Sequence, residues 1–245
     1  MKYSLLILLI AQAVMTQTFK EQQLKFPRVR SAFNEKQEKV QQLLTAVKVD
    51  PKSFTIFLRA YKSEQRLEVW AKNRLEKKHV LVTSYPFCAS SGVPGPKRQE
   101  GDGQIPEGIY HIRHFNPVSS FHLSLGINYP NASDAVLGVK GKLGGEIYIH
   151  GDCVTVGCIP ITDDLIKELY VFAVEACSGG QEEIPVHIYP FMMNDDAVHS
   201  IEQWNDAAPD VKLFWNNLIP IHRAFESTKE LSPVTIDRSG LYHLQ

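Results

Sequence analysis

GGEIYIHGDCVTVGCIP, residues 144–160, joins a short apolar run to a histidine and a cysteine. The run Ile147–Ile149 ends at His150, and Cys158 follows eight residues later. The apolar run is typical of a short strand, and the residues after Cys158 favour a helix. Such a strand, loop and helix are able to hold an imidazole against a thiol.

The residue types in this stretch suit nucleophilic catalysis. A cysteine attacks as its thiolate, and an adjacent imidazole lowers the pKa of the thiol by ion pairing. The imidazole needs one fixed tautomer, and the backbone carbonyl of Gly151 is the candidate acceptor for its second N–H. Gly157 permits a tight turn that directs N–H groups toward an oxyanion. We predict His150 as the base, Gly151 as its orienting partner and Cys158 as the nucleophile.

The residues alone leave other interpretations open. Cys158 is also a candidate for a disulfide or for the hydrophobic core. His150, Cys153 and Cys158 are plausible zinc ligands, but no fourth ligand follows at a familiar spacing, although His187 and Cys177 exist. We nevertheless expect no metal ion and no cofactor.

The composition is that of an ordinary globular protein. The chain has 245 residues, of which 44% are hydrophobic and 22% charged, so it is long enough for one large domain and an extension. The net charge of −1 gives no electrostatic attraction toward a polyanion. We therefore expect no nucleic-acid partner.

The first residues resemble a secretory signal. Met1 and Lys2 give a positive start, Leu5–Ile10 is aliphatic, and Ala11–Ala13 has the small-x-small form of a cleavage site. We assign residues 1–16 to a signal peptide and expect an extracytoplasmic protein, in the periplasm or cell envelope. An uncleaved anchor is the alternative. No later stretch is long and apolar enough to predict a transmembrane helix.

Four cysteines remain to be accounted for. Outside the cytoplasm, Cys88, Cys153, Cys158 and Cys177 are compatible with two disulfides in three connectivities. If Cys158 is a reactive thiol, one pair and one buried thiol are expected instead. Because Cys153 is close to Cys158 in sequence, oxidation that links these two and silences the thiol is a further hypothesis.

The chain divides into three parts after the signal. Residues 17–51 have helical spacing of apolar residues and predict one amphipathic helix, and residues 52–192 form the main domain. Residues 193–245 predict two helices and a terminal hairpin that turns at residues 238–240. The expected core anchors of this extension are Trp204, Leu213, Phe214, Trp215, Leu218 and Phe225.

The main domain is predicted to be mainly β. A glycine- and proline-rich segment at 90–108 excludes regular structure there. Thr162 is expected to cap a helix that stops at residues 178–180. Short strands separated by turns favour a sandwich or barrel over a parallel sheet, which gives an α+β protein with helices at both ends. The expected strands are residues 54–58, 67–71, 80–85, 109–114, 121–127, 147–150 and 185–189.

Several stretches in order resemble the YkuD-domain family of L,D-transpeptidases. Ile149–Gly151 followed by Gly157–Ile159 is similar to the family's active-site signature. Gly95–Tyr110 resembles its "GD…TPEG.Y" stretch, and Phe121–Asn131 its "L…YPN" strand. The resemblance covers residues 52–192 and is nearest to the YafK-like branch, which also carries a C-terminal extension. The chain departs from the usual pattern at Thr155, Val156 and Pro160, where many relatives have serine, histidine and arginine.

The resemblance implies a YkuD-like catalytic fold and a substrate. The substrate is a peptidoglycan stem peptide that contains a diamino acid, and Cys158 attacks the carbonyl of its L-centre in an L,D peptide bond. An amine acceptor gives transpeptidation and water gives hydrolysis. We expect substrate contacts at Tyr129, Thr155 and Gly157, whereas Asp102 suits a turn and Asp152 a solvated loop.

Two alternatives to the transferase remain. The same site can act as an amide hydrolase that trims peptidoglycan or releases peptide or wall-linked protein from it. A non-catalytic cell-wall-binding protein is the alternative from another class.

Overall fold

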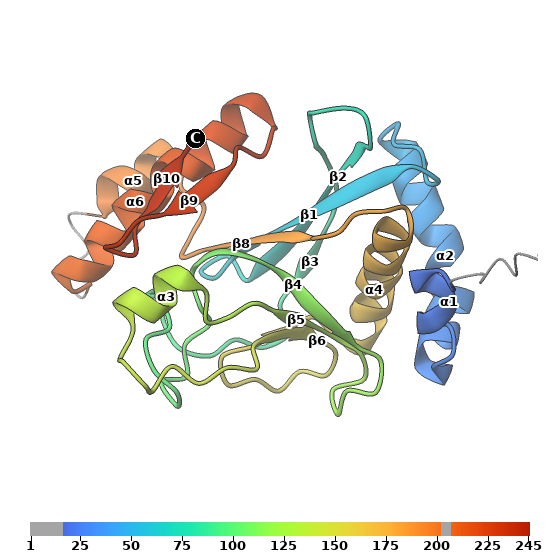
Figure 1. Cartoon of the computed structure of the whole chain (residues 1–245), viewed down its shortest axis with the longest axis horizontal. Coiled ribbons are helices and arrows are strands. Elements are labelled where there is room, and N and C mark those ends of the chain that lie inside the picture. The colour runs from blue at the N-terminus through green and yellow to red at the C-terminus, as the bar shows by residue number, and fades with distance from the viewer. Residues whose placement is uncertain (1–16, 202–206) are drawn as a thin grey trace, which may run out of the picture.

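One curled sheet of eight strands forms the centre of the protein (Figure 1). The computed structural model describes residues 17–201 and 207–245. The strand order is β3-β2-β1-β8-β4-β5-β6-β7, and only the β1–β8 and β6–β7 pairs are parallel. The predicted mainly β fold with flanking helices is confirmed. The strands are β1 (Phe54–Tyr61), β2 (Arg66–Asn73), β3 (Val80–Pro86), β4 (Gly108–Asn116), β5 (Ser124–Ile127), β6 (Tyr148–His150), β7 (Ile159–Pro160) and β8 (Pro185–Tyr189).

The two edges of the sheet meet. The N–H of Cys88, just beyond β3, donates to the carbonyl of Pro160 in β7 at 3.0 Å. Cys88 also forms a disulfide with Cys153, with their Cα atoms 5.3 Å apart. Since β3 and β7 are the outermost strands, these bonds bring the sheet close to a barrel.

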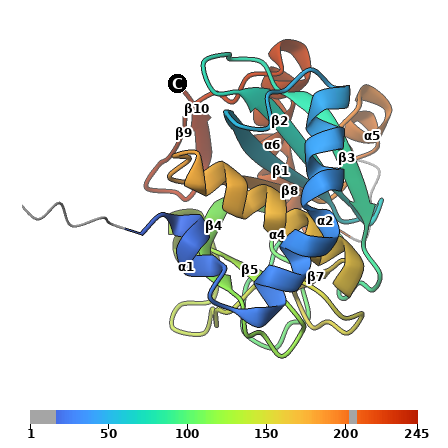
Figure 2. The ribbon, with the colours of Figure 1, turned by 90° about the vertical axis from the view of Figure 1, so that its right-hand side faces the viewer.

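Three helices cover one face of the sheet. They are α1 (Phe19–Gln23), α2 (Pro27–Ala46) and α4 (Asp163–Ser178), and Figure 2 shows α2 and α4 side by side. Helix α4 is capped by Thr162, as predicted, and buries most of its residues between the sheet and α2. The single helix expected over residues 17–51 is divided, because α1 ends at Gln23 and Pro27 then starts α2.

The C-terminal extension packs at the opposite end of the sheet (Figure 1). It contains α5 (Asp195–Ser200), α6 (Pro209–Thr228) and the hairpin β9 (Val234–Ile236) with β10 (Tyr242–Leu244), so its two predicted helices and terminal hairpin are confirmed. The short helix α3 (Ala132–Leu137), which sequence reasoning missed, lies beside it.

The predicted anchors of the extension are mostly correct. Phe214, Trp215, Leu218 and Phe225 are buried. The prediction that Leu213 is a core anchor is wrong, because this side chain is 60% exposed on the side of α6 that also carries Asn216 and Pro220. Trp204 and the signal peptide assigned to residues 1–16 lie outside the described residues. Within the described ranges, no helix combines the length and apolar character needed to cross a membrane.

Candidate active site

The register of β5, β6 and β7 separates a core face from an open face. Leu125 pairs with Ile149, and Ile149 pairs with Ile159; all three side chains are buried in the core that includes α4. Because side chains alternate along a strand, Tyr148 and His150 must point to the opposite face. This opposite face carries the candidate site.

His150 and Cys158 occupy that same face. His150 is the last residue of β6, and Cys158 immediately precedes β7. The parallel pairing of Ile149 with Ile159, extended by one residue, sets Cys158 beside Tyr148. The N–H of Tyr148 points at the sulfur, with 3.4 Å between N and Sγ. Cys158 therefore lies opposite Tyr148, which is two residues before His150 in β6.

The imidazole of His150 is held in one orientation. Its Nδ1 hydrogen-bonds the carbonyl oxygen of Gly151. Since a carbonyl only accepts, Nδ1 carries the proton and Nε2 keeps a free lone pair. The ring of Phe121 packs on the imidazole with 4.7 Å between centroids. A Cβ at Gly151 would lie 2.5 Å from Oδ1 of Asp163, so only glycine fits beside the histidine.

Burial favours the neutral forms of His150 and Cys158. Burial lowers the pKa of His150, although the carbonyl of Gly151 and the charge of Asp152 oppose this. Burial raises the pKa of the Cys158 thiol, against the N–H of Tyr148 and the charge of Lys97. The resting pair is therefore a thiol and a neutral imidazole. This differs from the ion pair expected from the sequence.

Hydrogen bonds of Thr155 and Gly157 fix the backbone around Cys158. The hydroxyl of Thr155 donates to the carbonyl of Cys158 at 2.8 Å and accepts from its N–H at 3.0 Å. Gly157 has φ +90°, and its N–H donates to Oγ of Ser91 at 2.7 Å. The N–H groups of Gly157 and Cys158, which were expected to face an oxyanion, thus donate to hydroxyls instead.

The disulfide changes two sequence-based hypotheses. Cys153 is bonded to Cys88, so the expected oxidation of Cys153 with Cys158 is wrong; the meeting of the sheet edges brings Cys88 to Cys153 first. The zinc alternative also loses Cys153 as a thiolate ligand. Over residues 17–201 and 207–245, no group of three or more His, Cys, Asp or Glu is placed to hold a metal ion.

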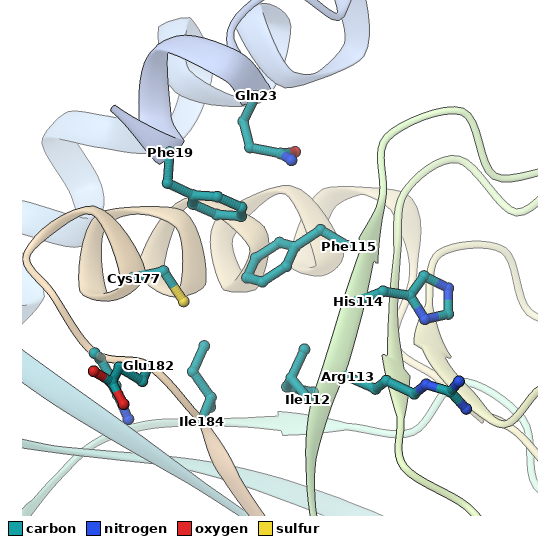
Figure 3. A pocket seen from close by; sticks show the side chains of 10 residues that line it. Phe19, Gln23, Ile112, Arg113, His114, Phe115, Cys177, Glu182 and Ile184 are labelled. Carbon is teal, nitrogen blue, oxygen red and sulfur yellow. The ribbon is translucent and has the colours of Figure 1, made fainter. Parts of the chain in front are cut away.

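Cys158 and Cys177 are the two free thiols, and of these only Cys158 lies beside the strand that carries His150. Cys177 lies on α4 in a pocket of mixed polarity, where Phe19 and Phe115 are near it (Figure 3). Burial raises the pKa of Cys177 to about 11. This thiol is therefore protonated at neutral pH, and it serves as a natural control for Cys158.

Tyr129 lines a pocket of about 340 Å³ next to the thiol. Its ring is buried and its hydroxyl donates to the carbonyl of Leu143 at 3.0 Å. Glu146 and Tyr148, which line the pocket, also have backbone groups in contact with Sγ of Cys158. The lining residues are Arg113, His114, Ile127, Tyr129, Glu146, Ile147 and Tyr148.

The two aspartates of the motifs have local roles. The carboxylate of Asp102 accepts from the N–H groups of Arg98, Gln99 and Gln104 and from Nζ of Lys97. The Asp102 carboxylate therefore stabilises a turn, as predicted from the sequence. Asp152 is exposed and accepts from the N–H of Cys153.

Sequence reasoning missed three neighbours of the reacting pair. Ser91 contacts Gly157 from a distant loop, and nothing in its local sequence signals this, whereas Phe121 begins the Phe121–Asn131 stretch that resembles the family. Lys97 is 5% exposed and its charge acts on Cys158. Its position in the Gly-Pro-Lys motif was a signal that could have identified it.

These features define a cysteine–histidine site on a curled sheet, and the chain belongs to the YkuD family. The family model for the L,D-transpeptidase catalytic domain matches residues 55–188. Members of this family act on peptidoglycan. The predicted recognition of the family is therefore confirmed.

The relatives agree with the predicted YafK-like branch. The chain is 33% identical over 185 residues to YafK of Escherichia coli (strain K12), whose name assigns it provisionally to the L,D-transpeptidases; the match covers 74% of this chain and 70% of YafK. The structure of the helical cell shape determining protein Pgp2 from Campylobacter jejuni matches with a TM-score of 0.45 and 17% identity, over 76% of this chain and 73% of Pgp2. A variant of Pgp2 matches with a TM-score of 0.43 and 20% identity, over 61% of this chain and 53% of the variant. The chain thus spans about half the length of that variant.

Proposed function

We propose that the protein is an extracytoplasmic cysteine acyltransferase that acts on L,D peptide bonds of peptidoglycan stem peptides. The observation that carries this proposal is the placement of Cys158 beside β6 on the same face as His150, whose Nδ1 is fixed by Gly151. Membership of a peptidoglycan-acting family supplies the substrate class. The leader-like residues 1–16 and the Cys88–Cys153 disulfide both support an oxidising compartment outside the cytoplasm.

The chemistry follows from the protonation states. Nε2 of His150 removes the thiol proton as Sγ of Cys158 forms a bond to the carbonyl carbon of the substrate's L-centre. The tetrahedral intermediate collapses when the leaving amine takes that proton from the imidazolium. A thioester on Cys158 remains. The neutral resting pair suits this sequence, because the proton moves only when substrate is in place.

The second half-reaction returns the enzyme to its starting state. An acceptor amine or a water loses a proton to Nε2 of His150 and attacks the thioester carbon. The carbon–sulfur bond breaks and Sγ recovers the proton. An amine acceptor gives a cross-linked or exchanged peptide, and water gives a trimmed stem or a released wall-linked protein.

Mass spectrometry of muropeptides tests the proposal. Purified disaccharide-tetrapeptide is incubated with the parent protein, with Cys158→Ala and with Cys177→Ala, which removes the other free thiol. We expect the parent and Cys177→Ala to give the same products and a transient acyl adduct on the protein, and Cys158→Ala to give neither. Product masses distinguish cross-linking, exchange and hydrolysis. Processing by Cys158→Ala at the parent rate would overturn the proposal and favour a different role at the cell wall.

A further inference from the structure

An irregularity in β4 turns two basic residues toward the open face. Ile112 pairs with Ile127 and His114 pairs with Gly126, so Arg113 is an extra residue without a partner on β5. Neighbouring residues of a regular strand point to opposite faces, but a β-bulge can turn two neighbouring side chains to the same face. Figure 3 shows Phe115 pointing toward Phe19 and Cys177, whereas Arg113 and His114 leave the other side of β4.

The pocket next to the thiol lies over a glycine. A Cβ at Gly126 would lie 2.5 Å from the ring of His114 and 3.1 Å from that of Tyr148, so both rings lean across it. These rings meet edge to face, with centroids 5.3 Å apart. The side chains of β4 and β6 therefore border one pocket on the face that carries Cys158.

Arg113 is one of several described arginines that form no ion pair with a carboxylate; Arg28, Arg30 and Arg74 donate to backbone carbonyls instead. Arg59, Arg66 and Arg223 each form an ion pair with a carboxylate. Arg113 is exposed, and no carboxylate within residues 17–201 and 207–245 forms an ion pair with it. A long cation at a pocket rim with no internal counterion is available to an external anion.

Glu146 adds the opposite charge to the same pocket. Its backbone carbonyl accepts from Sγ of Cys158, and its carboxylate accepts from the hydroxyl of Tyr148. Glu146 also adopts φ +60°, a left-handed conformation that is uncommon outside glycine. The carboxylate therefore lies at the Tyr148 hydroxyl, and the same pocket presents both a carboxylate and a guanidinium.

We propose that Arg113 and Glu146 select a substrate centre that carries both a free carboxylate and a free ammonium. Arg113 binds the carboxylate and Glu146 binds the ammonium. This inference rests on the proposed function, in which the attacked carbonyl belongs to the L-centre of a diamino acid. The matching group is then the free amino-acid end of that same residue.

The dimensions agree with this assignment. Cys158 lies beside β7 and Arg113 lies in β4, which are separated by three strand spacings, roughly 14 Å in all. The arginine side chain reaches back over part of that distance. The remaining gap suits the methylene chain between the two ends of a diamino acid. A phosphate or other purely anionic group fits less well, because Glu146 would repel it.

Matched stem peptides test this selection. Three tetrapeptides are compared by kcat/KM: one with meso-diaminopimelate, one with the free carboxylate of that residue converted to an amide, and one with lysine, which keeps the ammonium and lacks the carboxylate. We expect the parent to prefer the free carboxylate by roughly 10- to 100-fold, the range of a charge-assisted hydrogen bond. Arg113→Met should lose this preference by slowing the free-carboxylate peptide alone. Arg223→Met, which removes an arginine paired with Asp195, should keep it.

The outcomes separate the two proposals. If the parent processes none of the peptides, the proposed function fails. If the parent processes the acid and the amide equally, or if Arg113→Met keeps the preference, only the selection by Arg113 is overturned. The rate of Cys158 alkylation by iodoacetamide should be the same in Arg113→Met and parent, which shows that the thiol site is intact. Glu146→Gln should slow a peptide with a free ammonium more than its N-acetylated form; equal slowing would refute the role of Glu146.

Discussion

Replacing Glu107 by glutamine tests how the C-terminal extension supports the site. Glu107 is fully buried, and one of its oxygens accepts from Nζ of Lys62 at 2.9 Å and from the N–H of Gly95 at 2.7 Å. The other oxygen accepts from Nε1 of Trp215 in α6 at 2.8 Å. A glutamine amide at this position would turn its NH₂ group toward groups that are themselves donors. It would also leave the charge of Lys62, whose side chain is 4% exposed, without a counterion.

The expected loss is large for a single conservative change. Leaving a buried charge unpaired costs about 3–5 kcal/mol in the free energy of unfolding. In a chain of this size, each kcal/mol lowers Tm by about 2–4 °C. Urea unfolding followed by far-UV circular dichroism measures the change without relying on the fluorescence of Trp215. Arg223→Gln is the control, because its ion pair is exposed and contributes at most about 1 kcal/mol.

A double-mutant cycle identifies the partner. Lys62→Met combined with Glu107→Gln should be less destabilised than the sum of the two single variants by more than about 1 kcal/mol, because the charge has been removed with its counterion. A Glu107→Gln protein within about 1 kcal/mol of the parent would refute the reasoning. Additive effects in the cycle would show that Lys62 and Glu107 are not energetically coupled.

Three further predictions concern Cys158, the Cys88–Cys153 disulfide and Thr155. Because burial raises the pKa of the Cys158 thiol and lowers that of His150, alkylation of Cys158 in a Cys177→Ser background should keep increasing above pH 9; a plateau between about pH 6 and 8 would instead indicate a preformed ion pair. Replacing both Cys88 and Cys153 by alanine should cost about 2–4 kcal/mol in unfolding free energy, and a reductant should destabilise the parent but not this variant. Thr155→Val should slow muropeptide processing by about 10-fold or more, since it removes two hydrogen bonds to the backbone of Cys158, whereas Thr155→Ser should retain the rate; equal rates in both variants would contradict this role.

The strands could be predicted where apolar residues recur locally. Residues 54–58, 67–71, 80–85 and 185–189 lie within β1, β2, β3 and β8, because these strands have enough length for their pattern to be visible. The strand expected over 121–127 begins only at Ser124. Before it, His122 has φ +68° and its carbonyl accepts from Arg28, so a contact with α2 shapes this segment. Strand β7 has two residues, too few for any periodicity.

The site shows the same division between local and distant information. His150, Gly151 and Cys158 are close in sequence, so their pattern placed them in one stretch. Arg113 enters through a bulge, which depends on strand register rather than on composition. Ser91 enters through a hydrogen bond between residues 66 positions apart. Such contacts depend on the complete fold, and a single sequence does not encode them in a local motif.

The hydrogen bond from Trp215 to Glu107 also constrains when the site matures. It joins residues 108 positions apart, and Glu107 in turn fixes Gly95 in the loop that adjoins Gly157. The histidine and the cysteine both precede the tryptophan in the chain, so they are synthesised first. Until α6 has been synthesised and has packed, one oxygen of the buried carboxylate lacks its donor and the loop lacks its final support. The loop beside Gly157 and Cys158 therefore acquires its final support only after α6 has folded.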